Sequence, residues 1–481
     1  MDWRRRTHGV RVPSPAIGFP GDQEAGRLDF IPWVFAGFPR QNEMSSWLPI
    51  APTLHLPPML LYDLFPLLAG PFSQWERHFA RAGGMGFDWI FVNPIQKTGA
   101  SRSLYSVADY FAINPVLLDP GATAAPDDQV KQMTARARAA GLRVMIDLVI
   151  NHCASDSALT REHPEWFVRE GDGRIKHPSC QHNGETVVWH DLAQFDHRHT
   201  RDPEGLYRYC LRVVEHLAGL GFEGFRCDAA YQIPADFWRR LLRDARSRHP
   251  RLCFVAETLG CAAEETKETA LAGFDFVFNS SKWWNFRDGW LVESYNLVRE
   301  TTRSISFPES HDTVRLAEEL NGNVNGLKQR YLFSALFSSG VMIPAGFEFG
   351  MRKPLHVVHT TPADWHENGI DLRSYIKQVN TLKQGHAVFQ EEGPTRFIPC
   401  ANPNILLMRK SSTRDRAEAL LILNLDLWSH QEFSVDHLRH YLPGDASLRD
   451  VSPEFPLEQV REPFHYALRP GQGIVLLGSR R

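Results

Sequence analysis

The sequence alternates, over most of its length, between short apolar runs and amphipathic stretches. An apolar run at residues 59–65 (MLLYDLF) is followed by an amphipathic stretch at 73–86 and a second apolar run at 87–95. The runs are almost continuously hydrophobic, as expected of parallel strands buried on both faces. Eight strand–helix units within about 300 residues predict a closed (β/α)₈ barrel rather than an open doubly wound sheet. The remaining six apolar runs lie at residues 142–152, 222–230, 251–260, 274–281, 304–312 and 341–350.

Three regions depart from this alternation. Residues 1–56 are rich in Pro and Gly and predict an irregular N-terminal extension. A polar, His-rich segment at 153–200 is too long for an ordinary loop, so we expect an inserted subdomain after the third strand. From residue 393 to 481 the pattern changes to short β-rich runs, which predict an antiparallel C-terminal β-domain. The barrel is therefore expected to occupy residues 57–392.

The charge pattern excludes several kinds of partner. The formal net charge is only -3 over 481 residues, and no long run of Lys or Arg is present. A nucleic-acid or anionic-membrane partner is therefore not expected. No segment approaches the roughly 18 apolar residues of a membrane span. A neutral ligand fits better, and the 13 Trp residues are compatible with a sugar-binding surface, with core packing as the alternative for most of them.

The cysteine pattern bears on location. Seven cysteines are scattered without a CxxC pair or regular spacing, and three of them, Cys153, Cys227 and Cys253, lie in or beside predicted strands. This pattern suits reduced thiols better than a disulfide framework or a zinc site. The basic first 15 residues lead into no apolar stretch and lack the centre of a secretory signal. We therefore predict a soluble, cytoplasmic protein.

Charged residues gather at the predicted strand ends. Arg226 and Asp228 end the fourth apolar run, Glu257 follows the fifth, and Asp312 ends the seventh. Residues two apart in a strand share a face, so Arg226 and Asp228 could simply pair at the rim of a core. In barrels of this kind, however, the chemistry lies on the loops after the strands. Three carboxylates from three strands are therefore expected at one mouth.

Three neighbouring carboxyl groups repel one another. At least one of their pKa values should therefore rise, while another group must be held ionised by a cation. Arg226 is suited to hold Asp228 ionised. An ionised carboxylate facing a protonated one is the arrangement of retaining glycosidases, in which the groups are about 5–5.5 Å apart. His152 and His311, also at strand ends, are expected to supply neutral imidazoles as hydrogen-bond donors to sugar hydroxyls, with a structural role as the alternative for each.

Four segments carry a family resemblance. They are DLVINH (147–152), GFRCDAA (224–230), FVAETLG (254–260) and FPESHD (307–312). In order and spacing they resemble the conserved regions of the α-amylase family, glycoside hydrolase family 13. The resemblance covers roughly residues 58–480 and includes the inserted segment and the C-terminal domain.

The resemblance implies a role for each matching residue. It implies that Asp228 is the nucleophile, Glu257 the general acid/base, and Asp312 the carboxylate that stabilises the oxocarbenium-like charge. It further implies binding and supporting residues: Arg226 to position the nucleophile, His152 and His311 to bind hydroxyls of the reacting glucose, Tyr105 to stack under the same sugar, and Asp147 and Asn151 to support the site.

The chain departs from the pattern after the nucleophile. Many endo-acting α-amylases carry Lys and His where this sequence has Tyr231 and Gln232. The departure puts both an endo-amylase activity and the usual calcium site in doubt. Asn151 remains as a single possible ligand, whereas Ca²⁺ takes six to eight oxygens. We therefore expect no metal and no cofactor, with a structural calcium possible but unsupported.

Other features bear on specificity. Exo-acting α-glucosidases of the family often have an Arg three residues after the last catalytic Asp. Arg315 matches that position, so the resemblance implies that it binds substrate, but Arg102 replaces the Asp that these enzymes carry before the stacking Tyr. Arg102 is either a surface charge or a phosphate contact. Family members that transfer maltosyl units from maltose 1-phosphate have an Asn-Pro-His run after the nucleophile, which this chain lacks.

A tryptophan-rich segment, residues 279–290 (NSSKWWNFRDGW), follows the sixth strand. It places Trp283, Trp284 and Trp290 near the predicted mouth. We predict that Trp284 contributes to a sugar-stacking platform at an acceptor site, with core packing as the alternative.

Taken together, these observations predict an α-retaining glycoside hydrolase acting on α-glucosidic bonds of malto-oligosaccharides or a related α-glucan. The first alternative is an α-glucan transglycosylase, either a maltosyl- or glucanotransferase or a trehalose-forming type. A non-catalytic sugar-binding relative is the second alternative, against which the intact Asp228, Glu257 and Asp312 argue. The expected partner is an α-glucoside, and the oligomeric state is left open.

Overall fold

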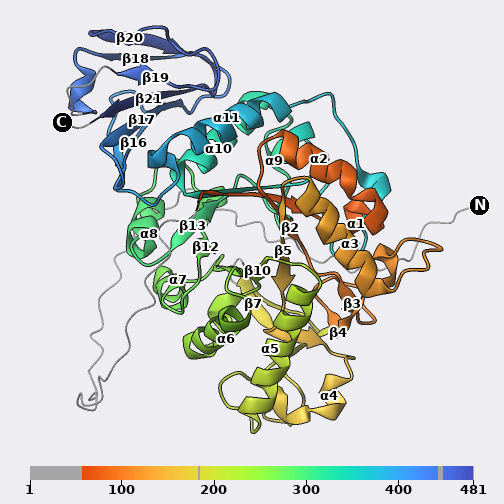
Figure 1. Ribbon diagram of the computed structural model, residues 1–481. Coiled ribbons are helices and arrows are strands. Elements are labelled where there is room, and N and C mark those ends of the chain that lie inside the picture. Colours follow the sequence, from red (N-terminus) through yellow and green to blue (C-terminus); the bar gives the residue numbers. More distant parts are fainter. Residues whose placement is uncertain (1–56, 183–184, 443–447, 480–481) are drawn as a thin grey trace, which may run out of the picture.

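Eight parallel strands close into a barrel at the centre of the molecule (Figure 1). This computed structural model describes residues 57–182, 185–442 and 448–479, so the extension predicted for residues 1–56 lies outside the described residues. Neighbouring strands pair in parallel around the ring, which confirms the predicted (β/α)₈ fold. The barrel strands are β1 (Met59–Leu64), β2 (Trp89–Val92), β5 (Arg143–Leu148), β10 (Gly224–Cys227), β11 (Cys253–Ala256), β12 (Phe276–Phe278), β13 (Arg303–Ser306) and β14 (Gly340–Pro344).

Helices connect the strands and surround the barrel (Figure 1). The longest helix, α5 (Pro203–Gly219), has two features that favour a helix start. Asp202 accepts a hydrogen bond from the Gly205 N–H, and Pro203 occupies the first turn. The helices are α1 (Pro66–Ala69), α2 (Glu76–Gly84), α3 (Pro126–Ala139), α5 (Pro203–Gly219), α6 (Ala235–Arg248), α7 (Ala263–Ala270), α8 (Trp290–Val298), α9 (Leu316–Glu319), α10 (Val324–Phe337) and α11 (Arg373–Gly385). Short 3₁₀ helices lie at Phe72–Gln74, Pro115–Leu117, Pro164–Trp166, Ala230–Gln232, Ser281–Trp283, Phe347–Phe349, Pro362–Asp364, Ala387–Phe389 and Leu438–His440.

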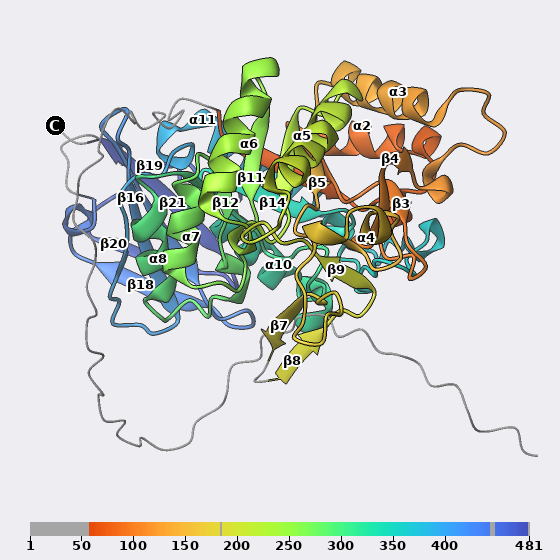
Figure 2. The same ribbon diagram turned by 90° about the horizontal axis from the view of Figure 1, so that it is seen from below.

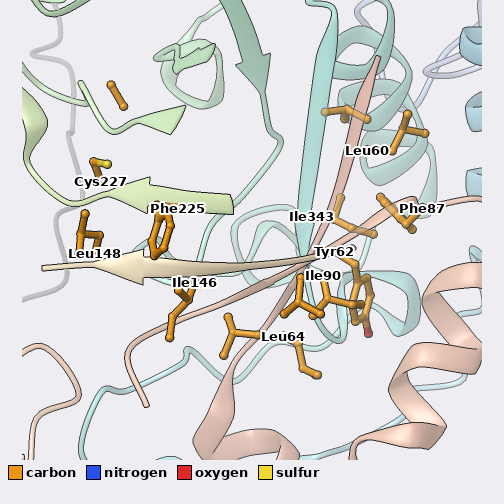
Figure 3. Close-up of a cluster of buried hydrophobic side chains, with 14 of the residues drawn as sticks. Leu60, Tyr62, Leu64, Phe87, Ile90, Ile146, Leu148, Phe225, Cys227 and Ile343 are labelled. Carbon is orange, nitrogen blue, oxygen red and sulfur yellow. The ribbon is translucent and has the colours of Figure 1, made fainter. Parts of the chain in front are cut away.

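Side chains fill both faces of the barrel wall. Successive residues of a strand point to opposite faces, so one set enters the barrel and the other meets the helices. The inner cluster includes Leu61, Phe91, Met145, Val255 and Ile305. The outer cluster, part of which Figure 3 shows, includes Leu60, Tyr62, Ile90, Ile146 and Phe225. Because the interior is packed with apolar side chains, a ligand site has to lie at the strand ends rather than inside the barrel.

Two inserted segments extend from the ends of the barrel strands. The first is the hairpin of β3 (Gln96–Thr98) and β4 (Val107–Ile113), between β2 and α3. The second lies between β5 and α5, where β6 (His152–Ala154) pairs antiparallel with β9 (Leu192–Gln194) and so returns the chain to its starting point. Between these two strands lie α4 (Leu159–Glu162), β7 (Ser179–His182) and β8 (Glu185–Val188), and Figure 2 shows β7 and β8 projecting from the body of the molecule.

The C-terminal region forms two antiparallel sheets beside α10 and α11 (Figure 1). Leu406 and Leu421 belong to the main core cluster, whereas Leu407 and Leu420 belong to a separate cluster between the two sheets. The alternation explains why these strands are nearly all apolar. The antiparallel pairing confirms the predicted C-terminal β-domain. The larger sheet contains β15 (Thr395–Ile398), β16 (Ile405–Ser411), β17 (Ala417–Asn424), β21 (Gly473–Ser479) and β19 (Arg449–Asp450), and the smaller one β18 (Gln431–Val435) and β20 (Phe464–Leu468).

A search of the helices in the described residues finds none that is long and apolar enough to cross a membrane.

Candidate active site

Inward-facing residues of the strands are apolar within the barrel and become polar at one end of it. These polar residues keep the alternation of the strand, so they face the barrel axis above the apolar layers. The result is a polar ring at the carboxyl ends of five strands. In these strands the inward residue is followed two residues later by a polar one: Leu61 by Asp63, Phe91 by Asn93, Met145 by Asp147, Gly224 by Arg226 and Val255 by Glu257.

Asp228 and Glu257 are neighbours because the sheet register continues past the strand ends. Cys227 pairs with Ala256 in the parallel ladder. The Glu257 N–H then donates to the Cys227 carbonyl at 3.0 Å, and the Asp228 N–H donates to the Leu148 carbonyl at 3.2 Å. Both backbones are thus fixed by the barrel. Adjacent strands lie about 4.8 Å apart, and a side-by-side carboxyl pair is what a retaining glycosidase requires.

Arg226 joins two carboxylates inside the site. Its guanidinium is buried, and Nη1 donates to Asp228 Oδ1 at 2.6 Å and to Asp147 Oδ1 at 2.9 Å. A buried charge is costly unless it is paired and hydrogen-bonded. The arrangement brings together the Arg226–Asp228 pair and the supporting residue Asp147 that the sequence predicts.

The Glu257 carboxyl group is held by the backbone of its own loop and of the neighbouring loop. Oε2 accepts from the Ala229 N–H and Oε1 from the Leu259 N–H, both at 2.8 Å. Ala229 has a φ of 42°, a left-handed conformation that non-glycine residues rarely adopt and that is found at functional sites. Burial raises the pKa of Glu257 to about 7; Arg226 opposes this rise, and the nearby Asp228 carboxylate adds to it.

The raised pKa predicts a pH profile. A general acid must be protonated before it can donate, and Glu257 is protonated below its pKa of about 7. We expect kcat/KM for a glycosidic substrate to fall above about pH 7, by about tenfold per pH unit. Kinetics between pH 5 and 9 would test this, and a basic limb near pH 4.5, the ordinary value for Glu, would contradict it.

His311 lies between two carboxylates. Its Nδ1 is 2.9 Å from Asp63 Oδ2, and its Nε2 is 3.0 Å from Asp312 Oδ2. Burial alone would lower the pKa of His311, but the carboxylates of Asp312 and Asp63 together raise it well above its usual value. The expectation of a neutral imidazole at His311 is therefore wrong. Burial in turn would raise the pKa of Asp312, but the His311 charge lowers it, so Asp312 is an ionised carboxylate held by a cation.

Tyr105 connects the two halves of the site. Its hydroxyl donates to Asp147 Oδ2 at 2.7 Å and lies 2.8 Å from His311 Nε2, and Asn93 donates to it at 3.2 Å. The Tyr105 and His311 rings are stacked, with an interplanar angle of 13°. The ring of Tyr105 is only partly buried.

His152 and Asn151 follow β5 and lie at the same mouth. His152 is buried, and its two ring nitrogens have no hydrogen-bond partner among the described residues. Burial lowers its pKa, so the ring is neutral and carries one donor and one acceptor. Asn151 donates through Nδ2 to Gln232 Oε1 at 2.8 Å, so its amide braces the loop after the nucleophile. In the part of the chain that the structure describes, no cluster of three or more His, Cys, Asp or Glu could hold a metal ion.

Arg315 does not reach the substrate mouth. Its side chain is 0% exposed, with Nε 3.1 Å from Glu309 Oε1 and Nη2 donating to the Ala345 carbonyl at 3.0 Å. The prediction that it binds substrate is wrong. Its guanidinium instead braces the segment that carries Asp312, because a buried arginine is stable only where carboxylates and carbonyls surround it.

Trp284 is also a core residue. It is 1% exposed and stacks on Phe333 and Phe397, with ring centroids 5.1 and 4.5 Å away. Phe397 belongs to the C-terminal sheet, so Trp284 joins that sheet to the barrel and has no free face for a sugar. The prediction of a stacking platform at Trp284 is therefore wrong. Its neighbour Trp283 is only partly buried.

The packing of Trp284 predicts a loss of stability on truncation. Trp284→Ala would remove a buried ring from the domain boundary and should lower the free energy of unfolding by about 3–5 kcal/mol. Trp283→Ala, which shortens a partly exposed ring, is the matched control and should cost less. Urea unfolding followed by circular dichroism would compare the two, and equal losses would contradict the assignment.

Asp63 and Asn93 also belong to the site, although neither was predicted from the sequence. Asp63 is the only charged residue in the first apolar run, and Asn93 interrupts the second. Both occupy positions in their strands that face the barrel axis, as the other site residues do. A polar residue at an inward-facing position near the end of an apolar run could have indicated that they belong to the site.

Comparisons with known proteins identify similar sequences and structures. Residues 54–168 match the model of the glucanotransferase domain of glycogen debranching enzyme. The chain is 28% identical over 390 residues to an α-1,4-glucan:maltose-1-phosphate maltosyltransferase of Burkholderia pseudomallei, covering 76% of this chain and 33% of that protein. It is 24% identical over 398 residues to the enzyme of the same name from Mycobacterium tuberculosis, covering 76% of this chain and 54% of the relative. The chain thus spans between a third and about half of the length of these two relatives.

Solved structures share the fold. An α-amylase from Lactobacillus plantarum superposes with a TM-score of 0.68 at 20% identity, covering 88% of this chain and 98% of that one. The trehalose-6-phosphate hydrolase of Bacillus licheniformis gives a TM-score of 0.69 at 13% identity, with coverages of 88% and 99%. The structure is therefore a (β/α)₈ barrel with a ring of carboxylates at the carboxyl ends of its strands. In its motifs and in these comparisons the chain is similar to members of the α-amylase family.

Proposed function

We propose that the protein is a retaining α-glucan transglycosylase that moves a malto-oligosaccharide unit from an α-glucoside donor to a sugar acceptor. The observation that carries this proposal is the adjacent pair of Asp228, bound by Arg226, and Glu257, whose pKa is raised to about 7. Transfer is favoured over hydrolysis because the similar curated proteins are named maltosyltransferases. Hydrolysis, our first expectation from the sequence, would be the same reaction with water as acceptor.

The reaction takes two steps. In the first, Glu257 gives its proton to the glycosidic oxygen, the bond from that oxygen to C1 breaks, and an Asp228 oxygen bonds to C1 to form a β-glycosyl ester. In the second, ionised Glu257 takes the proton of an acceptor hydroxyl, whose oxygen bonds to C1 as the ester bond breaks. Two inversions at C1 give net retention of the α-configuration.

The neighbouring groups serve these steps. Arg226 and Asp147 keep the Asp228 carboxylate aimed at C1. Asp312, ionised beside His311, lies where positive charge develops on the sugar ring and stabilises it. The ring nitrogens of His152 are partners for sugar hydroxyls, and the Tyr105 ring is a surface below the sugar.

We propose that this chemistry needs neither metal nor cofactor. The support is that every step uses side chains present at the site. A cytoplasmic location is proposed on the free thiols of Cys153, Cys210, Cys227, Cys253, Cys261 and Cys400.

The test is incubation of the purified protein with maltose, maltoheptaose, trehalose or maltose 1-phosphate, each with and without a malto-oligosaccharide acceptor. Mass spectrometry and anomeric NMR follow all products. We expect α-anomers and products larger than the donor. Products that are only shorter would indicate a hydrolase, β-anomers would contradict the retaining mechanism, and no product from any donor would favour a sugar-binding relative.

A further inference from the structure

A second cavity lies between the barrel and the C-terminal sheet, away from the three carboxylates. It has a volume of about 210 Å³. Three segments form its walls: the loop between β12 and α8, the end of α9 together with α10, and the loop that leaves β17. None of the residues assigned to the active site lines it. The lining residues are Asn285, Phe286, Arg287, Leu320, Gln329, Arg330, Leu425 and Leu427.

The cavity is positively charged. Arg287 and Arg330 are part of its lining, and no Asp or Glu is. Arg330 donates to the Trp284 carbonyl at 2.7 Å and lies over the Phe286 ring at 4.1 Å, but forms no ion pair within the described residues. Burial lowers its pKa to about 10, so it remains protonated at neutral pH. Arg287 is exposed and donates to the Pro403 carbonyl at 3.2 Å.

The acidic groups nearby are engaged elsewhere. Glu319 pairs with Lys282 at 2.5 Å, and Asp288 accepts from the Asn285 amide at 2.8 Å. Asp426 accepts from the backbone N–H groups of Trp428 and Ser429 and from Gln431. Glu319 also acts electrostatically on Arg330, but it does not line the cavity. Two guanidinium groups therefore line a space whose walls carry no carboxylate, which is an environment that suits a phosphate group.

The rest of the wall suits a sugar ring. Phe286 and three leucines give the cavity an apolar side, and Trp428, next to Leu427 in the chain, is 78% exposed. Phe286 has a φ of 64°, a conformation that bulky L residues rarely adopt and that holds its ring against Arg330. Apolar and aromatic walls with a few fixed polar groups are the usual make-up of small-molecule sites.

We propose that this cavity binds a phosphate-bearing sugar, with Arg287 and Arg330 on the phosphate and Phe286 and Trp428 beside the sugar ring. The volume is below the roughly 300 Å³ at which drug-sized sites begin, so it suits one phosphorylated ring rather than a glucan chain. This site is independent of the proposed function, because it uses none of the catalytic groups.

Isothermal titration calorimetry of the full chain tests the proposal. The Asp228→Asn variant is the background, which prevents turnover, and excess maltose occupies the active site. The probes are glucose 1-phosphate, glucose and inorganic phosphate. Arg330→Gln and Arg287→Gln each remove one guanidinium, and Arg239→Gln, at an exposed arginine of α6, is the matched control for charge.

We expect glucose 1-phosphate to bind at least about tenfold more tightly than glucose, since hydrogen bonds to charged groups contribute most strongly. Each pocket variant should weaken it by at least about tenfold, and the control should not. Arg287 is exposed, so its variant keeps the test valid if Arg330→Gln fails to fold. Equal affinity for glucose and glucose 1-phosphate, or normal binding by both pocket variants, would overturn the proposal. Inorganic phosphate binding as tightly as the sugar phosphate would overturn the assignment of a sugar ligand.

Discussion

Replacing Asp228 with Asn is expected to lower kcat/KM by at least about 10⁴-fold, the scale at which loss of a nucleophile is felt. An amide of the same shape cannot bond to C1 and form the glycosyl ester. The protein should still fold, because Arg226 keeps its second partner, Asp147, at 2.9 Å. Steady-state kinetics on the best donor found in the product screen would measure the loss.

The control for this variant is Asp236→Asn, at an exposed position of α6. It makes the same chemical change away from the site and should keep wild-type kinetics. Thermal unfolding of both variants would separate lost chemistry from lost structure. An Asp228→Asn enzyme within about tenfold of wild type would mean that another group is the nucleophile.

The barrel could be predicted from the sequence because burial on both faces leaves a direct trace. Each strand of a parallel barrel is covered inside and outside, so it reads as an unbroken apolar run between turn signals. The same property located the site, because the first charged residues after a run, such as Asp228 and Glu257, stand at the strand end. Both inferences use only neighbours along the chain.

The predictions for Trp284 and Arg315 were wrong because the surroundings of these side chains depend on partners distant in sequence. Trp284 is buried because Phe397, from another domain, covers it. Nothing near a tryptophan in the sequence says whether its ring faces solvent or a sheet more than 100 residues away. Arg315 was assigned by position after Asp312, yet its contacts with Glu309 and Ala345 turn it into the fold.

The charge of His311 was also wrongly predicted from the sequence. Asp312 and Asp63 together raise its pKa, and Asp63 lies 248 residues earlier in the chain. Without that contact, the imidazole next to a single carboxylate was expected to be neutral. The pairing becomes visible only when the barrel closes and brings β1 and β13 to the same mouth, since both strands flank β14.

Replacing Glu257 with Gln is expected to lower kcat/KM on ordinary glycosides by about 10²–10⁴-fold, the usual contribution of a general acid or base. The amide keeps the size of the side chain but cannot give a proton to the departing oxygen. A glycosyl fluoride, whose leaving group needs no proton, should lose much less in the first step. The basic limb near pH 7 should also disappear, because the titrating group is gone.

The second step separates this role from a merely structural one. Without a base at position 257, the ester on Asp228 should persist when the variant is given a glycosyl fluoride, and peptide mass spectrometry should find the sugar on Asp228. Azide, which needs no deprotonation, should restore turnover and give an α-glycosyl azide, since it attacks the β-linked ester with inversion. A β-azide, or a fluoride rate that falls as far as the glycoside rate, would show that Glu257 is not the acid/base.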